Sequence, residues 1–111
     1  MAATDIAIVG WGQTPAYPRT DLTEPQLCMA ANIEAIASAG VDRHDIGFTC
    51  SGSCDYLTGG PFAFVQNLDA AGAWPPISES HVEMDGAWAL YEAWVRLQHG
   101  DIDLALVFAS G

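Results

Sequence analysis

Apolar residues along this chain fall into short continuous runs, and longer stretches with helical spacing lie between these runs. Four runs have the length and the β-branched or aromatic content of strands, at 6–10, 46–50, 77–84 and 104–109. The last of them is uninterrupted, which is typical of a strand that is covered on both faces. Segments rich in Gly, Pro, Ser and Asp separate the runs, and these predict loops and turns.

The first helical stretch carries clear start and stop signals. Thr23 and Gln26 have the spacing of a capping box, and Pro25 fits the first turn of a helix. Gly40 can adopt the left-handed conformation with which many helices end. Alanines recur in between and predict close packing of this helix on a sheet, at positions 30, 31, 35, 37 and 39.

Two further stretches predict helices. One is short and amphipathic, over 61–71, and is followed by the helix-breaking sequence 74–76, which contains two prolines. The other covers Gly86–Gln98 and has an apolar face that Trp88 and Val95 broaden. We therefore expect this last helix to be buried on most sides.

The alternation of strands and helices over residues 1–111 predicts a single α/β unit. Its sheet should be parallel or mostly parallel, with right-handed crossovers and with helices on both faces. Open sheets of this kind place ligands at the carboxyl ends of their strands. The small-residue loop Ser51–Asp55 follows a predicted strand, and it is either part of such a site or a plain turn.

The charge balance excludes some classes of partner. The chain has a formal net charge of −11, with fourteen acidic residues, three arginines and no lysine. Such an acidic chain is unsuited to nucleic acid and to anionic membrane surfaces. A ligand that carries several phosphates would need basic groups from another source, and solubility is the simplest role of the acidity.

The cysteines and the apolar runs bear on location. Three cysteines, no signal peptide and no run long enough to span a bilayer predict free thiols in the cytoplasm. Cys50 and Cys54 lie four positions apart, but no second ligand pair follows at useful spacing. The sequence therefore predicts no metal site.

The stretch Glu79–Leu90 predicts an extended segment, a sharp turn at Asp85-Gly86 and then a helix. Such a turn brings side chains to the amide groups and the positive dipole end of a helix. Through the family resemblance described next, Glu83 and His81 are the candidate catalytic residues, and Met84, Asp85 and Gly86 are candidates for substrate binding. The alternatives are a carboxylate at a helix terminus for Glu83 and a strand-surface imidazole for His81.

The segments Val82–Leu90 and Gly100–Val107 together resemble the first part of the thiolase superfamily. Members of that family carry Cys-Ala-Ser-Gly, a helix, then Gly-x-x-Asp-x-x-Leu and a strand that ends in small residues. The resemblance implies a thiolase-like layered fold, of which residues 1–111 are the N-terminal part without the C-terminal half.

The sequence departs from the family pattern at the position of the nucleophile. When Gly86 is aligned on the family glycine, Asp85 takes the place of Ser, Met84 that of Ala and Glu83 that of the nucleophilic Cys. Glu83 cannot form the acyl-thioester intermediate of a thiolase. It could instead accept backbone N–H bonds, act as a base or simply fill the site.

The chain is more similar to thiolase-like lipid-transfer proteins of bacterial steroid degradation, which lack that Cys. The resemblance of this chain to those proteins implies retro-aldol cleavage of a β-hydroxyacyl-CoA, with no cofactor beyond the CoA of the substrate. It also implies a homodimer and an OB-fold, zinc-ribbon partner of the acyl-CoA-associated type. Two alternatives stay open, an acetyl-CoA acyltransferase (a thiolase) and a non-catalytic scaffold or lipid-binding subunit.

Overall fold

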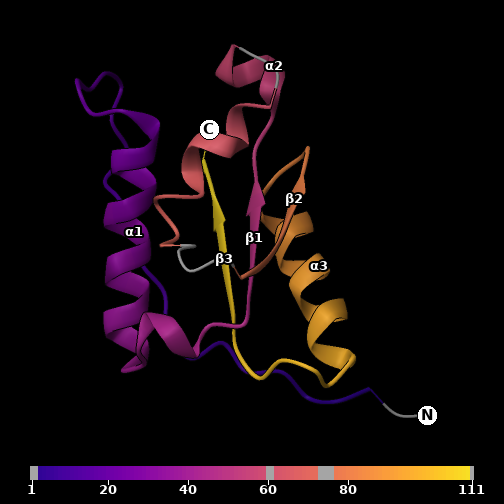
Figure 1. The fold of residues 1–111 in the computed structure, drawn as a ribbon. Coiled ribbons are helices and arrows are strands. Elements are labelled where there is room, and N and C mark those ends of the chain that lie inside the picture. The colour runs from indigo at the N-terminus through magenta and orange to yellow at the C-terminus, as the bar shows by residue number, and fades with distance from the viewer. Residues whose placement is uncertain (1–2, 60–61, 73–76, 111) are drawn as a thin grey trace.

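The structure is a computed structural model that describes residues 3–59, 62–72 and 77–110. It is a small α/β domain with parallel strands and flanking helices (Figure 1). Short 3-10 helices are denoted η in the text. In chain order the elements are α1 (Glu24–Ala39), η1 (Arg43–Asp45), β1 (Phe48–Gly52), α2 (Asp55–Thr58), η2 (Ala63–Asn67), β2 (Ser78–Val82), α3 (Gly86–Gln98) and β3 (Ala105–Ala109).

Three strands form a parallel sheet in the order β2-β1-β3 within the described part of the chain. Phe48 at the start of β1 lies opposite Ser78 and Ala105, and the three strands end together. All three carboxyl ends therefore meet at one edge. The predicted α/β class and parallel sheet are confirmed.

The prediction of a strand at 6–10 is wrong. This segment is extended but belongs to no sheet, and Ile8 is 76% exposed. Two glycines fit it closely against α1 instead. A Cβ on Gly10 would lie 2.7 Å from the carbonyl oxygen of Ala35, and one on Gly12 would lie 2.3 Å from that of Ala31. The alanine face of α1 thus packs on this segment, where the sequence predicted a sheet.

Hydrogen bonds fix this N-terminal segment at both ends. The amide of Thr4 donates to Oε1 of Gln98 at 2.7 Å, and the Gln98 amide nitrogen donates to the Thr4 carbonyl at 2.9 Å. Further along, the Trp11 amide donates to the Ser38 hydroxyl at 2.9 Å. The segment therefore joins the end of α3 to the end of α1 without pairing with β3.

Helix α1 begins as the sequence predicts. The Gln26 amide donates to the Thr23 hydroxyl, and the Thr23 amide donates to Oε1 of Gln26, which completes the capping box. Gly40 follows the helix with a φ of 69°. The predicted start and end of this helix are confirmed.

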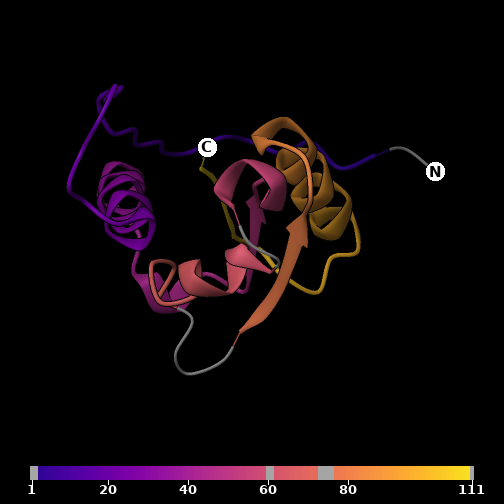
Figure 2. The same cartoon turned by 90° about the horizontal axis from the view of Figure 1, so that it is seen from above.

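The two faces of the sheet are covered by different elements (Figure 2). Ala89 and Ala93 of α3 pack on Phe48 and Cys50 of β1, and these four side chains form one buried cluster. The opposite face carries a second cluster around Ile46, Ala71 and Leu106, to which α1 contributes Ile36. Helices on both faces of the sheet, as predicted, follow from these two clusters.

Helix α3 has the predicted bounds but not the predicted burial. Only its two alanines, Ala89 and Ala93, are buried, because small side chains let the helix approach the sheet. Trp88 is 51% exposed and Tyr91 is 58% exposed, so the aromatic residues form an open band on the helix. The expectation of burial on most sides was wrong, since only the side of the helix that carries Ala89 and Ala93 is buried against the sheet.

Other predicted bounds shift in the structure. The strand predicted at 46–50 is displaced to Phe48–Gly52, and the one predicted at 77–84 is shortened to Ser78–Val82. The helix predicted over 61–71 is the 3-10 helix η2 followed by turns, and the break predicted at 74–76 lies outside the described residues. Nowhere in the described ranges is a helix both long and apolar enough to cross a bilayer.

Candidate functional site

A polar cluster lies where the parallel strands β1 and β2 end. Ser51 of β1 faces His81 of β2 across the ladder, and Ser51 Oγ lies 3.1 Å from His81 Nδ1. Ser51 is buried, and the His81 side chain is only 10% exposed. The pairing of the two strands therefore fixes the position and the ring orientation of the histidine.

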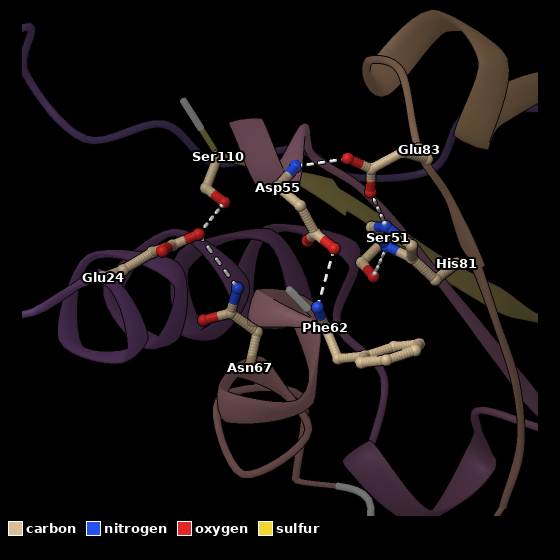
Figure 3. A network of polar contacts seen from close by, with 8 residues as sticks. All are labelled: Glu24, Ser51, Asp55, Phe62, Asn67, His81, Glu83 and Ser110. Carbon is tan, nitrogen blue, oxygen red and sulfur yellow. Dashed lines mark hydrogen bonds and ion pairs between the residues drawn. The ribbon is translucent and has the colours of Figure 1, made fainter. Parts of the chain in front are cut away.

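Glu83 holds the other side of the imidazole. Its Oε2 lies 3.0 Å from His81 Nε2, while its Oε1 accepts a hydrogen bond from the backbone amide of Asp55. The Glu83 side chain is 48% exposed, so this end of the cluster reaches the solvent. Ser51, His81 and Glu83 thus form a hydrogen-bonded series that runs from the buried sheet to the surface (Figure 3).

Asp55 completes the cluster at the start of α2. Its Oδ2 accepts a hydrogen bond of 2.6 Å from the Phe62 amide. Phe62 has a φ of 55°, in the left-handed region that bulky residues rarely adopt. One ligand atom from each of Asp55, His81 and Glu83 lies within 4.8 Å of the other two. These three side chains could therefore hold a divalent cation.

A second polar group ties the end of β3 to α1. Oε1 of Glu24 accepts hydrogen bonds from the Ser110 hydroxyl and, at 3.2 Å, from the Asn67 side-chain amide (Figure 3). The group joins the first turn of α1, η2 and the residue after β3. The two hydrogen bonds to Glu24 hold these elements together beside the site.

The candidate residues of the predicted turn separate in the structure. The N-cap of α3 is Asp85, whose Oδ1 accepts a hydrogen bond of 3.1 Å from the Trp88 amide. Glu83 accepts a backbone N–H bond, one of its three predicted alternatives, but the donor belongs to α2. Met84 is exposed and Gly86 begins α3 beside Ala109. Substrate binding by Met84, Asp85 and Gly86 stays a prediction.

Two of the cysteines are poor nucleophiles in this fold. Cys50 is fully buried, and desolvation raises its pKa to about 11, with a smaller contribution from the charge of Glu92. Burial also raises the pKa of the Cys28 thiol. A thiol with a raised pKa carries little thiolate near neutral pH. Neither Cys28 nor Cys50 is therefore suited to act as a nucleophile.

Sequence reasoning missed two members of the cluster as chemical groups. Ser51 and Asp55 were recognised only as parts of a small-residue loop, although Ser51 lies in β1 and Asp55 begins α2. Ser51 is thirty residues from His81, and only the strand register brings them together. The available signal was the position of this loop at the carboxyl end of a strand.

The fold and site define a small α/β domain with a polar cluster at the carboxyl edge of a three-stranded parallel sheet. The chain matches no protein-family model, and no curated protein matches it.

Proposed function

We propose that this chain is part of a thiolase-fold carbon–carbon lyase that cleaves a β-hydroxyacyl-CoA by a retro-aldol reaction. The observation that carries the proposal is the hydrogen-bonded pair of His81 and Glu83, with the second ring nitrogen of His81 held by Ser51. An imidazole oriented in this way by a carboxylate is a good general base.

The pair suits the proton transfers of this reaction. With Glu83 bonded at Nε2, His81 takes the proton of the β-hydroxyl group at Nδ1, either in place of the Ser51 hydroxyl or through it. Glu83 stabilises the imidazolium that forms. The bond between the α- and β-carbons then breaks, and its electron pair passes to the α-carbon as the enolate of the thioester. The β-carbon leaves as a ketone or aldehyde, and a proton returned to the α-carbon gives the shortened CoA ester. No sulfur nucleophile takes part.

Two of the three cysteines, Cys28 and Cys50, favour a lyase over a thiolase because both are buried. A thiolase forms a thioester on a reactive thiolate, and here Glu83 stands at the corresponding position. Cys50 directly precedes Ser51 in β1, and its side chain is fully buried on the opposite face of the sheet, against α3. Loss of the thiolate abolishes acyl transfer but leaves a retro-aldol step intact, because that step needs only a base and a stabilised enolate.

An apolar cleft on the β3 side of the sheet, which none of Ser51, His81 and Glu83 lines, offers room for an apolar part of the substrate. It has a volume of about 710 Å³ and lies between the N-terminal segment, α1, α3 and β3, with Ile8, Trp94 and Phe108 in its wall. That volume is within the range of ligand-binding sites. The phosphates of CoA would need cations from another chain, because this chain has three arginines and no lysine.

The exposed aromatic band of α3 supports the predicted assembly. Trp88, Tyr91 and Trp94 are partly or largely exposed, and Tyr91 stacks on Trp94 with ring centroids 6.1 Å apart. Aromatic residues are enriched where proteins meet. We assign this band to the contact with a second copy or with an OB-fold, zinc-ribbon partner of the acyl-CoA-associated type.

The test is incubation of the purified protein with a β-hydroxyacyl-CoA, followed by chromatography and mass spectrometry. A ketone or aldehyde and a shortened CoA ester are expected. His81→Gln should lower turnover by about 10²–10⁴-fold, the usual contribution of a general base. His44→Gln is the matched control, since His44 is exposed in η1 and pairs with Asp42 at 2.8 Å. Transfer of the acyl group to added CoA would instead identify a thiolase.

A non-catalytic subunit is the second candidate function, and the open aromatic band of α3 favours it. Such a subunit would show no turnover of its own but would raise the activity of a partner enzyme. Support of the partner would then survive His81→Gln and would fall with Tyr91→Ala, which removes an exposed side chain of the band.

A further inference from the structure

We propose that Asp55, His81 and Glu83 form a binding site for a divalent transition metal ion such as Zn²⁺. Their ligand atoms all lie within 4.8 Å of one another. Two nitrogen or oxygen ligands, each about 2.1 Å from the same ion, lie roughly 3.0–3.5 Å apart at the usual bond angles. His81 Nε2 and Glu83 Oε2 are already 3.0 Å apart, so both atoms can turn to one ion with little movement.

Contacts around the three side chains orient them for this role. Ser51 holds the Nδ1 side of His81 at 3.1 Å, which directs Nε2 toward Glu83. The Asp55 amide holds one oxygen of Glu83, and the Phe62 amide holds one oxygen of Asp55. Metal ligands in proteins are usually fixed by such outer hydrogen bonds. Each of the three ligands has one in this structure.

The charge of the site favours a cation. Two carboxylates lie together in a chain with a net charge of −11. Arg96 is paired with Asp101 at 3.1 Å and lies over the Phe48 ring, on the α3 side of the sheet. Arg43 lies beside Gly72 and His44. Both arginines therefore place their positive charge on other groups, and a divalent ion would supply positive charge at the site.

Ser53 provides an independent observation. Its side chain is almost fully buried, and its hydroxyl has no hydrogen-bond partner among the residues that the structure describes. The Ser53 amide donates to the Val82 carbonyl at 3.2 Å. This bond continues the hydrogen-bond ladder of β1 and β2 beyond Ser51 and toward Glu83. Strand alternation places Ser53 on the face of Ser51 and His81. A water molecule bound to the metal ion would give this buried hydroxyl its missing partner.

The choice of metal follows from the ligands. Imidazole suits zinc, copper, iron and nickel, whereas carboxylates suit harder ions. One imidazole with two carboxylates therefore favours borderline ions such as Zn²⁺ and disfavours Mg²⁺ and Ca²⁺. An effect on catalysis rests on the function proposed above: an ion on Nε2 displaces the Nε2 proton through which Glu83 stabilises the imidazolium, so Zn²⁺ should inhibit turnover.

The binding test uses the metal alone. Titration of the purified protein with Co²⁺, followed by visible absorption, should show one saturable site that Zn²⁺ displaces. The spectrum should lack the strong near-ultraviolet band of cobalt bound to thiolate, which separates this site from the three cysteines. His81→Gln and Asp55→Asn should each weaken binding by more than the about 10–100-fold that loss of an outer contact costs. His44→Gln should leave binding unchanged.

The result that would overturn the site is equal Co²⁺ affinity in the native protein and in His81→Gln, or a thiolate band at saturation. Circular dichroism of each variant shows whether the fold persists, and Asp55→Asn, which keeps the shape of the side chain, tests the site if His81→Gln unfolds. Metal binding without lyase turnover would refute the proposed reaction alone. Turnover that depends on His81 without metal binding would refute the metal site alone.

Discussion

Replacement of Gly52 by alanine tests whether the site depends on close approach of two backbone segments. Gly52 ends β1, between Ser51 and Ser53. A Cβ at this position would lie 2.3 Å from the carbonyl oxygen of Asp85 and 2.5 Å from its carbonyl carbon. Both contacts are with backbone, which cannot rotate away as a side chain can. The turn that begins α3 must therefore move away from β1.

The size of the effect follows from these contacts. Extra methylene groups in a packed region cost about 1–3 kcal/mol, and a clash with backbone lies at the upper end, so we expect a loss of about 3 kcal/mol. An unfolding entropy of about 2.1 cal/mol/K per residue converts this loss into a fall in Tm of roughly 13 °C for a chain of 111 residues.

The measurement is thermal and urea unfolding followed by circular dichroism at 222 nm. Gly86→Ala is the matched control, because its Cβ would meet only the Ala109 side chain, at 3.0 Å, and the residue begins a helix. The control should change stability by about 1 kcal/mol or less, since alanine favours a helix by about that amount over glycine. If Gly52→Ala is no less stable than Gly86→Ala, the close approach of β1 to α3 is refuted.

Three further predictions concern caps and a buried thiol. Thr23→Ala should cost about 1 kcal/mol in urea unfolding, because it removes the capping box of α1, and an unchanged midpoint would contradict this. Asp85→Ala should cost about as much while Asp85→Asn costs little, since Asn also caps; equal losses would argue against capping. Stability should fall as the pH rises from 9.0, where the unfolded Cys50 thiol ionises, to about 11, where the folded thiol ionises. Cys50→Ala should flatten this dependence of stability on pH. If the dependence persists in the variant, another group causes it.

The sequence was most informative where structure depends on near neighbours. The capping box of Thr23 and Gln26 lies within one turn of α1, and the bounds of α3 follow from its own spacing of apolar residues. Short apolar runs also identified three of the strands, with bounds shifted by a few residues. For the helices the deciding contacts lie within about four positions along the chain, and for the strands the signal is the composition of the apolar run itself.

The sequence failed where two patterns compete. The run at 6–10 has the composition of a strand, yet Gly10 and Gly12 pack it against the alanines of α1. Helix α3 has enough apolar residues for burial on most sides, but its alanines face the sheet and its aromatic residues stay exposed. Composition shows that a segment can be buried, but only packing decides which face is buried and against what.

The sequence by itself determined the α/β class, the capping box of α1, the extent of α1 and α3, and the presence of His81 and Glu83 beside the turn that precedes α3. Only the tertiary structure decided that Ser51 and Asp55 join them, because strands far apart in the chain must pair in one register before those side chains meet. Local hydrogen bonds and periodicity act over a few residues and can be read along the chain. Strand pairing acts through space, and its outcome depends on the whole core.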